Sequence, residues 1–203
     1  MTHPIFARGR SSETNTSATV KAGSDLIPVL NANSYFTSGD LVFISCSDDS
    51  DLECLGVVIS ATSSYLTSSW SLARAKEIGS KIWKAETFFR WLVPRIFPCE
   101  KKIDTGVRQL RSIGGNSFST RIYPLRTIEI LQLERASKSH LESFLLWAEN
   151  YLSGGLYSFT YVDCHREISK VQLISTQPSF KEEIAGMFNI ALELEVLQKG
   201  VYE

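Results

Sequence analysis

Four acidic side chains that separate two apolar runs are the first residues whose types and spacing suggest chemistry. Asp48, Asp49, Asp51 and Glu53 stand between the runs LVFIS and CLGVVIS. Carboxylates this close together could bind a cation, but a calcium loop of the EF-hand type needs a glycine at its sixth position and a bidentate glutamate at its twelfth, and that pattern is absent. Acidic residues are also typical of the solvated turn of a β-hairpin. We favour the turn and keep a weak cation site as the alternative.

A neighbouring thiol and imidazole, Cys164 and His165, form the second candidate pair. A cysteine becomes a strong nucleophile when a histidine takes its proton. Neighbours on an extended chain point to opposite sides, however, so this pair would need special geometry to form a hydrogen bond. The only other histidines are His3 and His140, so general bases are few. An enzymatic hypothesis requires Asp163, Cys164 and His165 to converge with another polar group in a cleft, and it is the least favoured.

The short motifs that carry phosphate, dinucleotide, zinc-protease or serine-hydrolase chemistry are absent. The sequence contains no G-x-x-x-x-G-K-[ST], G-x-G-x-x-G, H-E-x-x-H or G-x-S-x-G. Its glycine pairs, Gly114-Gly115 and Gly154-Gly155, are better interpreted as turns than as phosphate-binding loops. We therefore expect no catalytic residue, no cofactor and no metal, and we expect that the protein is not an enzyme.

Arginines in the middle of the chain raise the question of nucleic-acid binding. The segment KKIDTGVRQLRSIGGNSFSTRIYP contains or borders four of them: Arg108, Arg111, Arg121 and Arg126. Binders of single strands also need aromatic side chains on which bases stack, and only Phe118 and Tyr123 lie among these arginines. Acidic residues dilute the positive charge. A solvated hairpin or an assembly arm is the favoured interpretation of this segment.

The overall charge also argues against nucleic-acid specificity or binding to an anionic membrane. The 203 residues include 21 Lys+Arg and 22 Asp+Glu, which gives a formal net charge of -1. Both kinds of partner attract proteins with a basic surplus. No apolar run is long enough to span a bilayer, and the N-terminus MTHPIFARGRSSETNTS lacks the apolar segment of a signal peptide. We expect the protein to stay in the cytosol where it is made unless a larger assembly carries it out.

Cysteine usage is consistent with that compartment. The four cysteines form no C-x-x-C pair: Cys46, Cys54, Cys99 and Cys164. Reduced thiols are therefore expected. Cys46 and Cys54 flank the acidic turn and could face each other across two strands, but a disulfide there is the less favoured interpretation.

The N-terminal part predicts a small β module behind a polar arm. Residues 11–17 are all Ser, Thr, Asn or Glu, which indicates a mobile arm or a loosely held edge, and we assign residues 1–17 to a flexible polar arm. Residues 18–86 contain the short β runs ATVKA, DLIPVLNA, DLVFISCS, LGVVISATSSYLTSS and SKIWKA. The segment SLARAKEIGSKIW predicts one helical turn that ends at Gly79. Five strands and one helical turn indicate a small β-barrel or sandwich.

A dense apolar segment, ETFFRWLVPRIFPCEKK, opens the second domain, residues 87–203. Pro94 and Pro98 argue against one continuous helix through it. We expect a short helix or an extended strap that packs across a sheet or against a neighbouring subunit. Aromatic anchors dominate interface energies, so the possible subunit interface consists of Phe88, Phe89, Trp91 and Phe97. Burial of these residues within their own chain is an equally favoured alternative.

The rest of the second domain predicts strands around one helix. YPLRTIEILQLER predicts a strand whose apolar phase shifts between Ile130 and Leu131, which fits a bulge or a strand covered on both faces. Ser139 and Glu142 have the spacing of a capping box. The helix behind them carries an apolar stripe and ends at Gly154-Gly155; the stripe consists of Leu141, Phe144, Leu145, Ala148 and Leu152. LYSFTYVD and REISKVQLIS predict a hairpin that turns at DCH, and MFNIALELEVL predicts a strand with one apolar face.

These elements predict an α+β fold that is mainly antiparallel β. A small N-terminal β-barrel or sandwich module precedes a C-terminal antiparallel sheet, and one helix packs on that sheet through its apolar stripe.

The order of these motifs resembles that of tail proteins of bacteriophages and prophages. In the C-terminal part the resemblance lies in a helix of the L..F..W kind, a glycine, an aromatic F.Y.D strand and a final F.I.LELEV strand. The N-terminal part is similar to small β modules inserted in such proteins, where F..GDLV.I, an LGVVIS-like strand and L..A..IGSKIW follow in that order. In this chain the β module lies at the N-terminal side.

The resemblance implies a structural subunit of a distal tail, tail-tip or baseplate. Proteins of that group assemble into a ring, often a hexamer, between the tail tube and the tip. The expected partners are other copies of this chain and further tail proteins of the tube and the tip or hub. The expected location is the virion tail, with assembly in the bacterial cytoplasm.

A binding module is the alternative from another functional class. In it the N-terminal module would hold a carbohydrate or a host-surface molecule with Tyr65 and Trp70. Exposure of both aromatic rings on one face would favour this alternative, and burial of both would exclude it.

Overall fold

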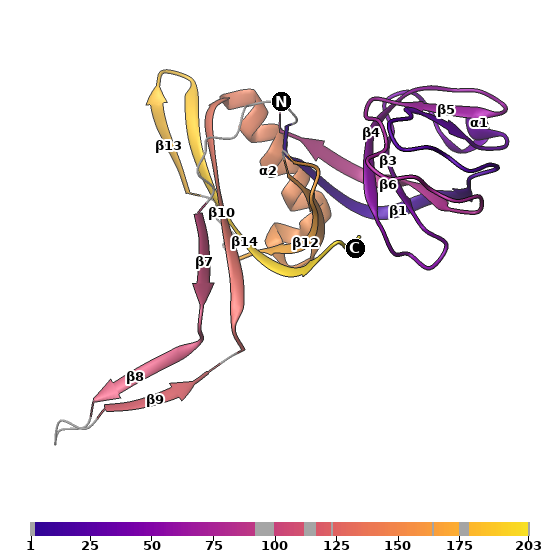
Figure 1. Ribbon diagram of the computed structural model, residues 1–203. Coiled ribbons are helices and arrows are strands. Elements are labelled where there is room, and N and C mark those ends of the chain that lie inside the picture. The colour runs from indigo at the N-terminus through magenta and orange to yellow at the C-terminus, as the bar shows by residue number, and fades with distance from the viewer. Residues whose placement is uncertain are drawn as a thin grey trace. The chain divides into compact units, whose positions relative to one another are not determined.

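The computed structural model describes residues 3–91, 100–111, 117–122, 124–163, 165–174 and 179–202. The chain divides into two compact units. Unit 1 comprises Met1–Leu92, Phe159–Lys170 and Gln198–Glu203, and unit 2 comprises Val93–Ser158 and Val171–Leu197. Both are built from antiparallel strands, and the longest helix packs on the sheet of unit 2 (Figure 1). This architecture confirms the predicted fold class, α+β and mainly antiparallel β.

Unit 1 contains a small closed β-barrel. Its strands are β1 (Ile5–Asn15), β2 (Leu26–Pro28), β3 (Leu41–Ser45), β4 (Glu53–Ala61), β5 (Tyr65–Ser68) and β6 (Lys81–Arg90), and one short helix, α1 (Ala32–Tyr35), follows β2. The strands pair in the order β2-β5-β4-β3-β6-β1. A bridge between Thr16 and Val29 joins the end of β1 to the end of β2. This bridge pairs the two outer strands, so the sheet closes.

Strand β3 shows why the barrel has two apolar clusters. Successive side chains of a strand point to opposite faces. Val42 and Ile44 belong to the cluster that also contains Ile27, Phe36 and Leu66. The other face of the same strand packs in a second cluster, which includes Leu41, Phe43, Trp83, Val162 and Tyr202. All five residues of β3 are therefore buried, and the strand reads as a continuous apolar run.

The N-terminal residues differ from the flexible arm predicted for residues 1–17. Ile5, Phe6 and Ala7 are buried in β1, which pairs with β6 along its length and with β11 (Phe159–Val162) near its start. The polar residues of the arm prediction continue this strand, with Ser11 opposite Lys84 and Thr14 opposite Ile82. The prediction of a flexible arm relied on polar side chains, but the backbone N–H and C=O groups of a polar segment can still form the hydrogen bonds of a sheet.

Two further predictions in unit 1 need correction. The segment before Gly79 forms turns, and the short helix lies at Ala32–Tyr35 instead. The predicted domain boundary at residue 86 is also too simple, because residues 159–170 and 198–203 return to unit 1.

Unit 2 is built around the long strands β10 (Arg126–Ser137) and β14 (Met187–Lys199), which are antiparallel neighbours. β7 (Glu100–Asp104) pairs with the other edge of β10, and β13 (Ser179–Ile184) pairs with β14. The predicted alternation of the last strand is confirmed, since Ile190, Leu192 and Leu194 are buried. The pairing of β10 with β14 is regular at Ile130 and Leu131, where the sequence suggested a bulge, and the register shift lies between Leu133 and Ala136.

Helix α2 (Lys138–Leu152) follows β10 directly, and a short 3-10 turn, η1 (Ser153–Gly155), ends it. Its buried stripe consists of Leu141, Phe144, Trp147, Ala148 and Leu152. The predicted capping box is wrong. Ser137 is the N-cap residue and accepts a hydrogen bond from the backbone N–H of His140 at 3.3 Å. β12 (Ile168–Leu173) follows the predicted hairpin turn after β11.

A two-stranded arm continues from one edge of the sheet of unit 2. β8 (Val107–Arg111) follows β7, and β9 (Ser117–Arg121) leads back to β10. The two strands pair with each other from Val107 opposite Arg121 to Arg111 opposite Ser117. Figure 1 shows this ribbon extending away from α2. The sequence prediction of a hairpin in this segment is confirmed.

Candidate functional site

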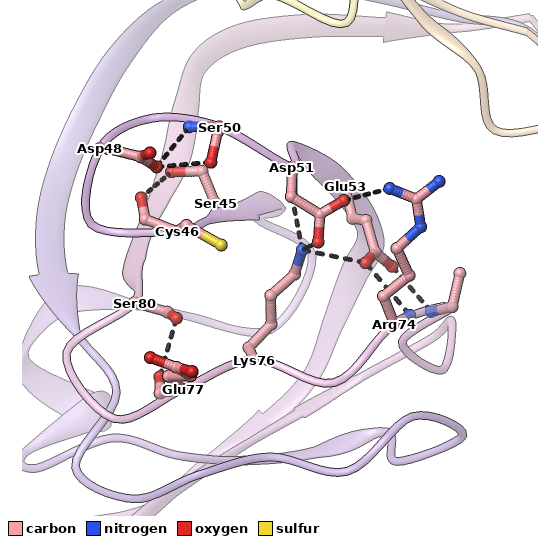
Figure 2. A network of polar contacts seen from close by, with 11 residues as sticks. Ser45, Cys46, Asp48, Ser50, Asp51, Glu53, Arg74, Lys76, Glu77 and Ser80 are labelled. Atoms are coloured by element: carbon pink, nitrogen blue, oxygen red, sulfur yellow. Dashed lines mark hydrogen bonds and ion pairs between the residues drawn. The ribbon is translucent and has the colours of Figure 1, made fainter.

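The acidic turn between β3 and β4 is a hairpin turn whose carboxylates face cations of the protein. Cys46 N–H donates to the carbonyl of Ser50, which closes the turn, and Asp48 accepts hydrogen bonds from Ser50 (Figure 2). Asp49 pairs with Lys81 at 2.8 Å and with Arg10 at 3.3 Å. The predicted hairpin is confirmed, but three of the four acids pair with basic side chains, and the fourth, Asp48, accepts hydrogen bonds within the turn.

Lys76 is the centre of a buried polar network next to this turn. Its side chain has no exposed surface, and its Nζ donates to the backbone carbonyl and the carboxylate of Asp51. Glu53 pairs with the same Nζ at 3.0 Å and also accepts hydrogen bonds from the backbone N–H groups of Ala73 and Arg74. Figure 2 shows these groups converging from two different loops. The network joins residues 73–76 to the start of β4.

Hydrogen bonds from the cations keep the aspartates of the turn ionised. The bond from Lys76 lowers the pKa of Asp51, and the bond from Lys81 lowers the pKa of Asp49. In the described part of the chain, no cluster of three or more His, Cys, Asp and Glu side chains could hold a metal ion. The geometry therefore favours a structural role for these acids.

A cavity of about 470 Å³ lies beside this network, within unit 1. Its walls carry both signs of charge, from Asp51, Glu53, Arg74, Arg166 and Glu167 among others. Several of these groups already have protein partners, and the guanidinium of Arg166 donates to the carbonyl of Ser71 at 3.0 Å. Because the cavity wall carries both signs of charge and several of these groups already pair within the protein, its charge does not indicate a particular class of ligand.

At the β11–β12 turn, the catalytic candidate Asp163 forms hydrogen bonds that stabilise the turn. Asp163 accepts hydrogen bonds at 2.8 Å from the backbone N–H groups of His165 and Glu167. This is the way in which an aspartate stabilises a reversal of the chain. Cys164 lies outside the described residues. The structure thus gives Asp163 a turn-stabilising role.

The described cysteines are free thiols. Cys54 is buried, and burial raises the pKa of its thiol to about 12. In the register of the hairpin Cys54 lies opposite Phe43 and not opposite Cys46. The register therefore does not bring Cys46 and Cys54 opposite each other, and the reduced state stays a prediction.

The four aromatic residues expected at a subunit interface have different environments. The side chain of Trp91 is fully buried, and its backbone N–H donates to the carbonyl of Pro4, so the ring offers no surface to a neighbour. Phe88 and Phe89 lie in β6 and are partly buried, opposite Ala7 and Phe6 of β1. Phe97 lies outside the described residues. For Trp91 the interface prediction is wrong, and burial within the chain explains its apolar character.

The two aromatic residues of the binding-module alternative, Tyr65 and Trp70, differ in exposure. The side chain of Tyr65 is 47% exposed on β5. Trp70 is partly buried, and the guanidinium carbon of Arg166 lies 4.9 Å from the centroid of its ring. A cation on the ring face occupies the surface that a sugar ring would need.

Exposed apolar residues at the base of the arm were missed at the sequence level. Four large side chains lie where β7 and β10 lead into β8 and β9, and their exposed fractions range from 43% to 63%: Ile103, Val107, Ile122 and Leu125. We call them the neck cluster. The available signal was a pair of apolar residues on each side of the glycine- and arginine-containing hairpin.

A second exposed apolar group lies at the C-terminal end of α2. Tyr151, Leu156 and Tyr157 are 44%, 73% and 48% exposed, and we call them the helix-end cluster. Apolar side chains that together form a continuous exposed patch are typical of surfaces that bind another protein. Both clusters belong to unit 2.

Among the described residues, none of the helices has the length and the apolar character that crossing a bilayer requires. Comparison with protein-family models finds no match for this chain, and comparison with curated proteins finds none either.

Proposed function

We propose that the chain is a structural subunit of a phage or phage-like tail that assembles with copies of itself into a ring at the tail tip or baseplate. The observation that carries this proposal is the arm of unit 2, whose neck exposes four large apolar side chains. Such side chains lower the solubility of a monomer, and their burial against a neighbouring subunit lowers the free energy of the assembly. The order of sequence motifs that resembles tail proteins supports the same role.

In this proposal the role is structural and includes no catalytic step. The first partner is another copy of the chain, in a ring for which six subunits is the first stoichiometry to test. Further partners are the proteins of the tail tube and of the tip or hub. The location is the virion tail after assembly in the bacterial cytoplasm.

The test is the mass and shape of the purified protein, measured by light scattering on a sizing column over a range of concentrations. Negative-stain images of any large peak then show whether the particles close. A closed ring supports the proposal, because head-to-tail contacts that close produce a ring of fixed size. Open filaments or a two-fold dimer contradict it, and so does a strictly monomeric chain.

A second proposal, a carbohydrate- or host-surface-binding module, rests on the exposure of Tyr65. An exposed tyrosine ring can stack on the apolar face of a sugar. A glycan array probed with the wild-type chain and with Tyr65→Ala tests it. Specific binding that the substitution abolishes supports this module, whereas an array without specific signal contradicts it.

A further inference from the structure

The helix-end cluster sits on a backbone that is fixed in place. Gln172 donates from its side-chain amide to the carbonyls of Gly155 and Leu156, at 3.3 and 3.2 Å. Gly155 has a φ of +104°, and a Cβ added there would lie 3.1 Å from the Cβ of Leu173. The turn that presents Leu156 is therefore closely packed. An apolar group on a fixed backbone loses little conformational entropy when a partner covers it.

The neck cluster is fixed in a similar way. Asp104 accepts from the backbone N–H of Gly106 at 3.1 Å and from two guanidinium nitrogens of Arg126 at 3.2 and 3.1 Å. Ile122 N–H donates to the carbonyl of Gly106 at 2.7 Å. These hydrogen bonds connect the two segments of the chain that enter and leave the arm at its base. Exposed apolar side chains on a fixed backbone thus occur at two places on the same unit.

The surroundings of the two clusters differ in charge. The last turn of α2 contains no basic residue, and Glu149 is exposed in that turn. Helix carbonyls at a C-terminus add partial negative charge. At the neck, Asp104 and Arg126 form an ion pair, Lys102 is exposed, and the sequence from Val107 to Ile122 adds three arginines and no acidic residue. Opposite charges around two apolar surfaces favour contact between them and disfavour contact of either surface with its own kind.

We propose that the neck cluster of one copy packs on the helix-end cluster of a second copy of this chain. This inference rests on the proposed function and names the two surfaces that join its subunits. The two surfaces differ, so each copy has one free neck and one free helix end after it has bound a neighbour. Repetition of such a contact produces a ring when the rotation closes.

Two charge-introducing variants and one control test the contact. Ile122→Glu alters the neck, and Leu156→Glu alters the helix end. Ile78→Glu is the matched control, because Ile78 is 66% exposed in a turn of unit 1. We expect each of the first two to raise the concentration at half-assembly at least about tenfold, the effect of losing one interface anchor. The control should assemble like the wild-type chain, with folding of all four proteins checked by circular dichroism.

An equimolar mixture of the two assembly variants gives the sharper result. Leu156→Glu retains its neck and Ile122→Glu retains its helix end, so the mixture should form one-to-one pairs that do not grow. Light scattering then gives twice the mass of the subunit, whereas either variant alone stays monomeric at that concentration.

The outcomes separate this inference from the ring proposal. Rings that form equally well from wild type and from both variants overturn the inference and leave the ring proposal standing. Open chains in wild type that both variants abolish support the inference and contradict the ring. A wild-type chain that stays monomeric at its highest soluble concentration contradicts both.

Discussion

The buried position of Lys76 would destabilise the folded protein if nearby anions did not compensate its charge. The side chain is fully buried, and its partners are the carboxylates of Asp51 and Glu53. An ammonium group removed from water requires close anions and satisfied hydrogen bonds. The acidic residues at the β3–β4 hairpin are therefore needed to hold residues 73–76 against the barrel.

Lys76→Met should destabilise the protein by about 3 kcal/mol, because it leaves the two carboxylates without their buried partner. Arg74→Met is the control. Arg74 also pairs with Asp51, but its side chain is 74% exposed, so its loss should cost less than about 1 kcal/mol. Urea denaturation followed by tryptophan fluorescence measures both. Equal losses for the two variants would contradict the central role of Lys76.

The same network predicts a stability that falls in acid. The hydrogen bond from Lys76 lowers the pKa of Asp51 in the folded protein. Its stabilisation is then fully present above the ordinary carboxyl pKa of about 3.9 and is lost as the pH falls through the lower, folded value. Denaturation at pH 6 and at progressively lower pH should show a smaller acid-induced loss for Asp51→Asn than for wild type. An identical pH dependence in both would contradict this assignment.

At the scale of elements, α2 begins two residues earlier than its sequence pattern suggests. Ser139 and Glu142 have capping-box spacing, but Ser137 makes the capping hydrogen bond with His140. Strand β10 ends at Ser137 and the helix starts at Lys138, so no separate loop exists in which Ser139 could act as a cap. The tertiary connection decides which serine is used.

Ser137→Ala should lower the free energy of unfolding by about 1 kcal/mol, the usual cost of losing an N-cap side chain. Ser139→Ala, two positions along, should change it by less than about 0.5 kcal/mol, as expected for an exposed surface position. Thermal and urea unfolding of the two variants provide the comparison. A larger loss of stability for Ser139→Ala than for Ser137→Ala would contradict this assignment and support the capping box.

At the scale of the whole molecule, unit 1 depends on the end of the chain. Tyr202 is buried, and its ring centroid lies 4.6 Å from that of Phe43 and 5.7 Å from that of Trp83. Its hydroxyl donates to the carbonyl of Gly9 at 2.7 Å. Residues separated by almost the full sequence thus form one apolar cluster, so the N-terminal module cannot be completed by residues 1–92 alone.

Tyr202→Ala should destabilise the protein by about 3 kcal/mol, because it opens a cavity between two aromatic rings. Tyr202→Phe keeps the ring and loses only the hydrogen bond, so its cost should be about 1 kcal/mol. Guanidinium denaturation distinguishes the two. A wild-type-like Tyr202→Ala would show that the C-terminal residues are dispensable for unit 1.

The sequence by itself determined the elements whose periodicity is strong. Alternation placed Ile190, Leu192 and Leu194 on the buried face of a strand, and helical spacing gave most of the buried stripe of α2. The glycines after that stripe gave its end. Local patterns of this kind depend only on which face of an element meets a core. The α+β class and the hairpin arm follow from the same patterns.

The tertiary structure alone decided which distant segments complete each unit. The polar stretch of residues 11–15 is part of a strand because β6 pairs with it, and no side-chain pattern within residues 11–17 reveals that partner. Lys76 looks like an ordinary surface residue until Asp51 and Glu53 surround it. The neck and helix-end clusters are apolar residues in a sequence full of apolar residues, and only the structure shows that these remain exposed. Exposure and pairing depend on contacts between residues far apart in the chain, which a local pattern does not contain.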